Sequence, residues 1–431
     1  MLDNPEAIPP LRALDCTVAR REGQPVVRLQ DPLGISPAAE VSLALLSIVR
    51  LFDGKRTVLD VQAEIARQTG QILPAGQLQQ VIQDLDSAYF LDSDRFRARL
   101  REVMGEWENS PVRPPQHAGG PSYPEEREAL GRTLDALTLR PGAVDPSGLR
   151  SDRPLRAVFA PHIDFERGGH VYTWAYHEVR RRVSAPEDGP GPVFVILGTC
   201  HQHMDQPFAV TRKGYGTPLG TAETDGRFIE RLERLSGADL LKDELCHKAE
   251  HSIEFQTVFL RHALGARRFT LVPILAGGFH EAVLQGVAPE NDPGVERFLD
   301  SLAETVVRTR KEEGRETVLV GSVDLAHVGQ HFGDKDRLTD RFLDEVRERD
   351  QALLAAAETV DSKAFFEEVC RDGNRRRVCG VGPMYTILCV LERLGASSGT
   401  MAAGHVLAYD QAVDKGADLC VSFASMAFED R

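Results

Sequence analysis

Three histidines in this sequence follow apolar segments that have the composition of β-strands. His162 comes after Phe159-Ala160-Pro161, His201 after Gly198-Thr199-Cys200, and His327 closes a segment that begins at Val323. Ligands of an open α/β sheet bind outside the carboxyl ends of its strands, so we expect the three imidazoles to share one pocket. Imidazole nitrogens bind transition metals and exchange protons near neutral pH, which makes a metal centre or an acid–base site the chemistry to test.

Each of these histidines also has a plain structural interpretation. A single histidine at a strand end satisfies a loop carbonyl about as often as it serves a function. His203, two residues beyond His201, is a weaker alternative ligand because His-x-His pairs are common in loops. The repetition of the pattern at three strand ends favours the functional interpretation.

Asp324 lies three residues before His327. A buried carboxylate at this spacing is suited to fixing the tautomer of the imidazole for general acid–base catalysis, whereas the alternative is an aspartate that caps the next turn. His251 lies in Glu250-His251-Ser252-Ile253-Glu254, at the start of an amphipathic segment. The acidic residues there suit a helix N-terminus whatever the function, and His251 taken alone would be a surface group.

Cys379 is the cysteine whose thiol we expect to be the most reactive. It follows Arg375-Arg376-Arg377-Val378 and precedes a predicted helix from Tyr385 to Leu394. Arginines and a helix N-terminus both favour the thiolate, which is a metal ligand and a nucleophile. Inert burial is the commoner fate of a free cysteine, and we expect it for Cys370, Cys389 and Cys420.

Composition excludes several classes of function. The 431 residues include 51 Lys and Arg against 65 Asp and Glu, a formal net charge of −14, which disfavours nucleic acid and anionic membranes as partners. No apolar run reaches the roughly 18 residues of a membrane span, and the first residues lack the apolar region of a signal peptide, so we expect a cytoplasmic protein. The seven cysteines are widely spaced without a CxxC pair, which predicts free thiols.

The elements that must position these residues fall into two predicted domains. A small domain over residues 1–108 has a strand near Val26–Leu29, helices over 38–52, from Thr57 and from Pro74, and a wing strand at Tyr89-Phe90-Leu91. That pattern suggests a winged helix, but residues 1–110 hold 12 Lys and Arg against 16 Asp and Glu, which argues against DNA binding. The Pro- and Gly-rich residues 109–125 are expected to be an extended linker.

Residues 126–431 are predicted to form an α/β domain. Strand-like segments at 155–160, 193–197, 269–276 and 317–323 alternate with amphipathic helices at 171–179, 228–235, 295–307 and 338–354. This alternation predicts a mostly parallel central sheet flanked by helices on both faces. Two last strands, at 405–409 and 419–428, are expected to form an antiparallel edge.

Residues of about 150–431 resemble the MEMO family, which includes the bacterial AmmeMemoRadiSam system protein B. The resemblance depends on seven segments that occur in the same order: Ala160-Pro161-His162, Ile196-Leu197-Gly198-x-x-His201, Thr217-Pro218-Leu219, Glu250-His251-Ser252-Ile253-Glu254, Val272-Pro273-Ile274-Leu275, Ser322-x-Asp324-x-x-His327 and Cys379-Gly380. Local departures are Thr199-Cys200, which replaces the usual Pro and small polar residue, and Gly382, where some members have histidine.

The resemblance implies a fold similar to the LigB-like class III extradiol dioxygenases, which hold Fe(II) with two histidines and a carboxylate. In MEMO-like proteins two histidines and a cysteine line the metal position, which implies His162, His201 and Cys379 here. The family's other site residues correspond to His251, Asp324 and His327. Iron and copper are the metals associated with such sites, and radical-SAM system proteins are the partners that the resemblance implies.

The N-terminal domain is similar to PqqD-type winged-helix domains, which recognise peptides. The similarity depends on Asp31-Pro32-Leu33-Gly34-Ile35-Ser36 and Leu51-Phe52-Asp53-Gly54-Lys55-Arg56-Thr57. It implies that a peptide pairs with a strand edge of this domain and is presented to the second domain.

The leading hypothesis is a metal-dependent, dioxygenase-like oxidoreductase that acts on a peptide or a small aromatic substrate. Fe(II) is the first choice of metal and copper the second; His327, oriented by Asp324, is expected to move protons, and His251 to help position substrate or oxygen. Cysteine in place of a carboxylate puts ring cleavage itself in doubt, because a thiolate is oxidisable. A zinc-dependent hydrolase with the same three ligands is the alternative, and a non-catalytic peptide- or protein-binding module with a vestigial pocket is the third hypothesis.

Overall fold

The computed structural model describes residues 6–21, 24–31, 33–145, 151–184 and 189–431, although some side chains between residues 15 and 30 are outside this description. The chain divides into two compact units, Met1–Ser110 and Pro111–Arg431. Within the described ranges, no helix is long and apolar enough to cross a membrane.

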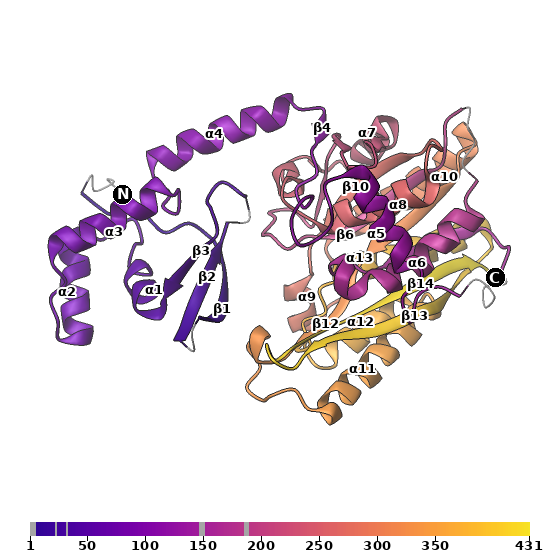
Figure 1. Cartoon of the computed structure of the whole chain (residues 1–431). Coiled ribbons are helices and arrows are strands. Elements are labelled where there is room, and N and C mark those ends of the chain that lie inside the picture. Colours follow the sequence, from indigo (N-terminus) through magenta and orange to yellow (C-terminus); the bar gives the residue numbers. More distant parts are fainter. Residues whose placement is uncertain (1–5, 22–23, 32, 146–150, 185–188) are drawn as a thin grey trace. The chain divides into compact units, whose positions relative to one another are not determined.

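The described residues of the first unit form a three-stranded antiparallel sheet and four helices, which are labelled in Figure 1. The second helix begins where the sequence predicts it, and Thr57 caps it through a reciprocal capping box with Asp60. The elements are β1 (Asp15–Arg21), β2 (Gln24–Gln30), β3 (Ala39–Ser42), α1 (Leu43–Val49), α2 (Val58–Thr69), α3 (Ala75–Ser87) and α4 (Asp94–Asn109).

The wing strand expected at Tyr89-Phe90-Leu91 is wrong. Tyr89 has a φ of 64°, which ends extended backbone, and Leu91 forms only an isolated bridge with Leu11. The helix expected over residues 38–52 is shorter, because residues 39–42 pair with β2 before Ser42 caps α1. Assignment of this unit to the PqqD-type winged helices therefore stays a prediction.

The linker expected at residues 109–125 is also wrong over most of its length. From Pro111 onward the chain belongs to the second unit, where β4 (Val112–Arg113) pairs with β8 (Gly214–Tyr215). The Arg113 guanidinium is fully buried and bonds to the Glu254 carboxylate at 2.5 Å. The prolines of this segment disfavour a helix, but they are compatible with an ordered extended chain. The buried Arg113 side chain anchors this extended segment to the second unit.

The second unit is built on a mixed nine-stranded sheet in the order β12-β14-β5-β11-β6-β10-β7, with β13 beside β14 and β9 beside β10. The pairs β5–β11, β11–β6 and β6–β10 are parallel, as the sequence predicts. The strands are β5 (Leu155–Ala160), β6 (Val193–Thr199), β7 (Phe208–Val210), β9 (Glu223–Thr224), β10 (Thr270–Ala276), β11 (Thr317–Ser322), β12 (Asp324–Val328), β13 (Ala402–Asp414) and β14 (Leu419–Asp430).

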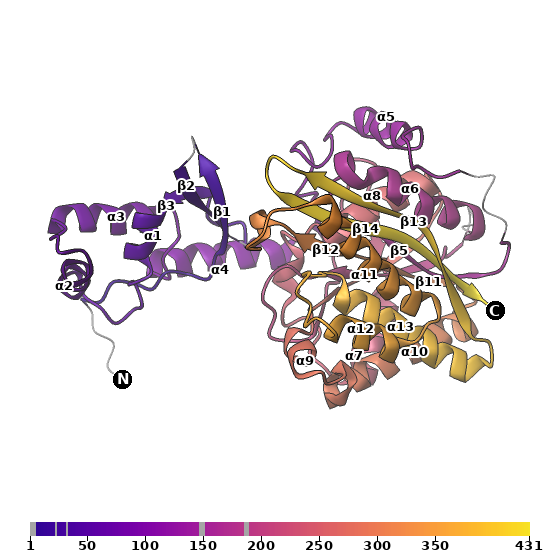
Figure 2. The same cartoon turned by 90° about the horizontal axis from the view of Figure 1, so that it is seen from below.

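Helices cover both faces of this sheet, as Figure 2 shows. One face carries α5 (Arg127–Leu137), α6 (Phe165–Arg182) and α8 (Ser252–Leu264); the other carries α7 (Gly226–Ser236), α9 (His280–Gln285), α10 (Pro293–Glu313), α11 (Asp340–Glu358), α12 (Ser362–Cys370) and α13 (Val381–Ser398). Short 3-10 helices are η2 (Glu244–His247), η3 (Pro289–Asn291) and η4 (Gln330–Phe332). Alternate strand residues enter opposite cores: Phe159 and Val195 join one, Val158 and Ile196 the other.

The two C-terminal strands form the antiparallel pair that the sequence predicts, and β13, whose only strand partner among the described residues is β14, lies at the edge of the sheet. β14 lies inside the sheet, between β12 and β5, and β13 pairs with it. β11 ends at Ser322, and His327 lies within the separate strand β12, which runs antiparallel to β14. The sequence predicts one strand at 317–323 that leads directly to His327, whereas the chain forms a second strand from Asp324 that contains this histidine.

Gly382 gives the fold a close backbone contact near the start of α13. A β-carbon at this position would lie 1.9 Å from the Gly277 carbonyl oxygen, which follows β10. A side chain at position 382 is therefore sterically excluded unless the start of α13 moves.

We predict that Gly382→Ala destabilises the second unit by about 1–3 kcal/mol, because the added methyl group overpacks a backbone contact. Gly131→Ala is the matched control, since Gly131 lies in α5 with open space around it and alanine is the better helix former. Urea unfolding followed by circular dichroism checks both variants. Equal midpoints for the two variants would contradict the assigned contact.

Candidate metal centre

Strand order brings two of the predicted histidines together. His162 and His201 each lie two residues beyond the ends of β5 and β6, and these strands flank β11 in parallel register. The third residue, Cys379, comes from the loop before α13. Its sulfur lies 3.6 Å from the Asp324 carbonyl oxygen, and the following Gly380 donates its N–H to the same oxygen at 3.1 Å.

The three donor atoms are close enough to share an ion. His162 Nε2 lies 3.2 Å from Cys379 Sγ, and the ligand atoms of His162, His201 and Cys379 all lie within 4.8 Å of one another. Tetrahedral coordination with metal–sulfur and metal–nitrogen bonds of about 2.3 and 2.1 Å would separate sulfur from nitrogen by roughly 3.6 Å. The residues therefore fit a first-row transition metal with only small shifts.

Hydrogen bonds orient both rings toward this point. His162 Nδ1 contacts the Ser322 carbonyl oxygen at 3.0 Å, and His201 Nδ1 contacts the Glu250 carboxylate at 3.1 Å. Each ring thus keeps Nε2 for the shared position, the arrangement that fixes the tautomer of metal-binding histidines.

Glu250 is a site residue whose role the sequence did not reveal. Its side chain is 1% exposed, accepts the N–H groups of His201 at 2.9 Å and His251 at 2.8 Å, and contacts the rings of both histidines. Burial would raise the pKa of Glu250, but the two imidazoles hold it well below its usual range. Its expected role at the start of α8 is real, since it accepts the N–H of Ser252 at 3.0 Å, but the carboxylate also supports His201.

His251 lies beside the ligand cluster. Its ring stacks on His201 with centroids 4.9 Å apart and meets His162 edge-on at 5.4 Å. His201, Glu250 and His251 form a second group of ligand atoms within 4.8 Å. His251 is therefore a site residue and not the isolated surface group that its position in the sequence alone would suggest.

The charges of the cluster favour a cation. Burial would raise the pKa of the Cys379 thiol, but the facing His162 and a hydrogen bond with His201 lower it to about 7. Burial lowers the pKa of His162, and the facing Cys379 sulfur partly opposes this shift. The pKa of His201 rises well above its ordinary value, because Glu250 and Cys379 outweigh burial, so metal binding would displace a proton.

Asp324 and His327 reach the site, but not as the expected pair. The Asp324 carboxylate accepts the N–H of His162 at 2.9 Å, whereas His327 Nδ1 contacts the carbonyl oxygens of Leu325 at 3.1 Å and Arg377 at 3.2 Å. Among the described residues, no hydrogen bond joins Asp324 to His327. Asp324 thus holds the loops of His162 and Cys379, and the prediction that it orients the His327 ring is corrected.

A cavity of about 430 Å³ opens above the cluster. Burial lowers the pKa of His327, which faces this cavity as a neutral base. His117 and His331 also line it; both escaped the sequence analysis, His117 because its segment was taken for linker. His203 does not take part, since its side chain is 90% exposed and lines a different cavity.

Comparison with known proteins matches the sequence of this chain to one family. A family model described as "Memo-like protein" matches residues 113–427. The matched region begins at the buried Arg113. A MEMO1 family protein of Aquifex aeolicus is 29% identical over 401 residues, covering 93% of this chain and 95% of that protein. A MEMO1 family protein of Thermococcus kodakarensis is 28% identical over 323 residues, covering 74% of this chain and 99% of that protein. A MEMO1 family protein of Thermus thermophilus is 29% identical over 347 residues, covering 79% of this chain and 92% of that protein. The chain belongs to the Memo-like family.

Proposed function

We propose that this protein is a metal-dependent oxidoreductase whose metal is held by His162, His201 and Cys379. The observation that supports the proposal is the convergence of these donors, within 4.8 Å of one another, beneath a cavity large enough for a small substrate. Two imidazoles and one thiolate leave coordination positions open on a first-row metal, which is the condition for binding O₂ or a chelating substrate. Fe(II) is the proposed metal, with copper second.

The chain's own residues would prepare the site for proton transfer. His327 keeps a hydrogen bond from Nδ1 to backbone carbonyls, so its Nε2 is the atom that would accept a proton from a substrate in the cavity. Glu250 holds His201 and His251 in place, and Asp324 holds the turn that carries His162. His251 would contact a substrate or oxygen beside the metal.

A peptide or a small aromatic molecule is the proposed substrate class. The aromatic alternative is supported by Phe255 and Phe332, which line the cavity together with the histidine rings. The peptide alternative is based on the similarity of the first unit to peptide-recognising domains. The proposal that radical-SAM proteins are partners is based on the family resemblance alone. In either case the polar groups at the cavity are carried by the second unit.

A zinc-dependent hydrolase is the second candidate, because the same donor set also suits catalytic zinc. In that case His327 would act as the base toward a metal-bound water. The third candidate is a binding module in which the cluster has no catalytic role. Metal identity and the effect of ligand removal separate the three.

We predict that the double variant His162→Ala/Cys379→Ala, purified anaerobically, retains less than about a tenth of the metal of the unmodified protein, because two of three ligands are lost. His203→Ala/Cys16→Ala is the matched control, since both of its side chains are exposed and outside the cluster. Elemental analysis should find about one iron or copper per chain in the unmodified protein and the control. Undiminished metal in the double variant would refute the site, whereas one equivalent of zinc without iron- or copper-dependent activity would favour the hydrolase.

We predict that iodoacetamide modifies Cys379 of the metal-free protein with a midpoint near pH 7, because the thiolate is the reacting form and its pKa is lowered from 9.0 to about 7. His162→Ala removes a favourable partner of the thiolate, so the midpoint should move upward by about one pH unit or more. Peptide mass spectrometry measures the rate at Cys379, with the exposed Cys16 as a control for reagent stability. An unchanged midpoint in the variant would contradict the pairing.

A further inference from the structure

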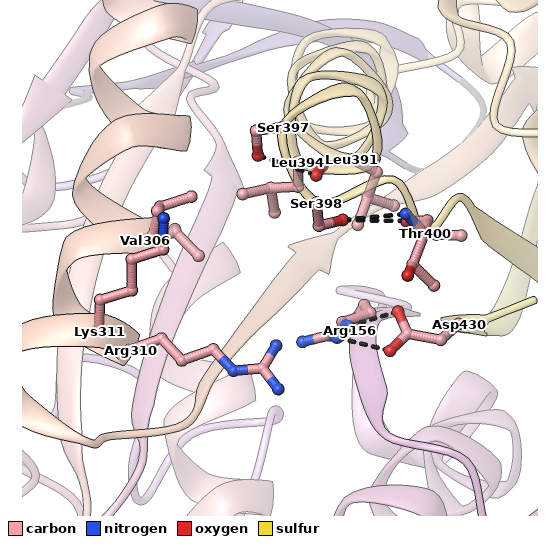
Figure 3. Close-up of a pocket in the computed structure, with 13 residues that line it drawn as sticks. Arg156, Val306, Arg310, Lys311, Leu391, Leu394, Ser397, Ser398, Thr400 and Asp430 are labelled. Atoms are coloured by element: carbon pink, nitrogen blue, oxygen red, sulfur yellow. Dashed lines mark hydrogen bonds and ion pairs between the residues drawn. The ribbon is translucent and has the colours of Figure 1, made fainter.

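A second cavity, of about 410 Å³, lies away from the metal centre. It is enclosed by the last turns of α10 and α13 and the start of β13 (Figure 3). Arg156, near the amino end of β5, lines it, whereas His162 follows the carboxyl end of the same strand. The two cavities are thus at opposite ends of β5, and this one has no part in the proposed metal chemistry.

The walls of this cavity are largely apolar. Val306 of α10 and Leu391 of α13 are buried, and Leu394 and Ala402 complete the apolar surface. A cavity of this size, lined mainly by aliphatic groups with a few convergent polar groups, is typical of a small-molecule site. The walls would therefore accommodate an apolar body.

Basic side chains outnumber acidic ones among the residues that line this cavity: Arg156, Arg310 and Lys311 against Asp430. Arg310 and Lys311 are exposed, and within the described part of the chain neither forms an ion pair or a hydrogen bond. In Figure 3 the Arg310 guanidinium extends toward Arg156, which is paired with Asp430 at 2.5 Å. Because Asp430 already neutralises Arg156, the charges that would favour an anion at the mouth of this cavity are those of Arg310 and Lys311.

Two other features account for part of this charge. Basic residues in the last turn of α10 complement the helix dipole, and Glu316 is near enough to feel the charges of Arg156 and Arg310. Neither feature gives Arg310 or Lys311 a direct ion-pair partner among the described residues, although the net charge of the chain is −14. An anionic ligand with an apolar body explains both the apolar walls and the basic side chains at the mouth.

We infer that this cavity binds a medium-chain monocarboxylate, with its hydrocarbon chain between Val306 and Leu394 and its carboxylate beside Arg310. The cavity is near the lower end of the usual volume range of ligand sites, which favours a compact amphiphile over a long-chain lipid. This inference does not depend on the proposed redox function, since no residue is shared between the two sites.

Decanoate is the probe, and isothermal titration calorimetry with the full chain is the measurement. We expect saturable 1:1 binding that Arg310→Gln weakens about tenfold, because one charge-assisted contact is lost. Arg297→Gln is the matched control: it removes the same charge from an exposed position on the same helix and should leave binding unchanged. Decanol, which lacks the charge, should bind more weakly than decanoate, and its affinity should be the same for the unmodified protein and the Arg310→Gln variant.

Leu394→Trp tests the apolar half of the site, because the larger side chain fills the cavity, and it should abolish decanoate binding while circular dichroism confirms folding. The inference is overturned if decanoate fails to bind at millimolar concentration, or if it binds equally to the Arg310→Gln and Arg297→Gln proteins. Concentration-dependent dimerisation that Leu394→Trp abolishes, without decanoate binding, would assign the cavity to a second copy and would also overturn it.

Discussion

The close approach of the α13 N-terminus to the sheet is the constraint on which the metal centre depends. A β-carbon at Gly380 would lie 2.7 Å from the Val323 side chain, and one at Gly382 would lie 1.9 Å from the Gly277 carbonyl oxygen. Only because both positions lack side chains can the helix start against the ends of two strands. That contact carries Cys379 to within 3.2 Å of His162, although 217 positions separate them in the chain.

The buried carboxylates of Glu250 and Asp324 order the loops that carry His162, His201 and Cys379. Glu250 and Asp324 are each about 2% exposed, and burying a charge is costly unless hydrogen bonds and opposite charges compensate. Glu250 has the His201 and His251 rings as partners, whereas Asp324 accepts the N–H of His162 and joins its loop to that of Cys379 through its own carbonyl. Their geometry is therefore fixed before any metal binds, which lowers the ordering cost of binding.

The sequence predicted the parts of the structure that depend on local pattern. Apolar runs located β5 and β6 and the histidines that follow them, because strand ends meet at one edge of a parallel sheet. Partners distant in sequence could not be read in this way: Glu250 looked like a helix cap, and Arg113 looked like part of a linker although it pairs with Glu254. The division of residues 317–328 into β11 and β12 depends on pairing with β14, which no local pattern encodes.

The central claim is that one sulfur and two imidazole nitrogens bind the same ion. X-ray absorption fine structure of anaerobically purified protein measures this set directly at the edge of the bound metal. The account predicts one sulfur at about 2.3 Å and at least two nitrogen or oxygen neighbours at about 2.1 Å, with the sulfur shell absent in Cys379→Ser. A first shell of nitrogen and oxygen alone, or a sulfur shell that persists in Cys379→Ser, would contradict it.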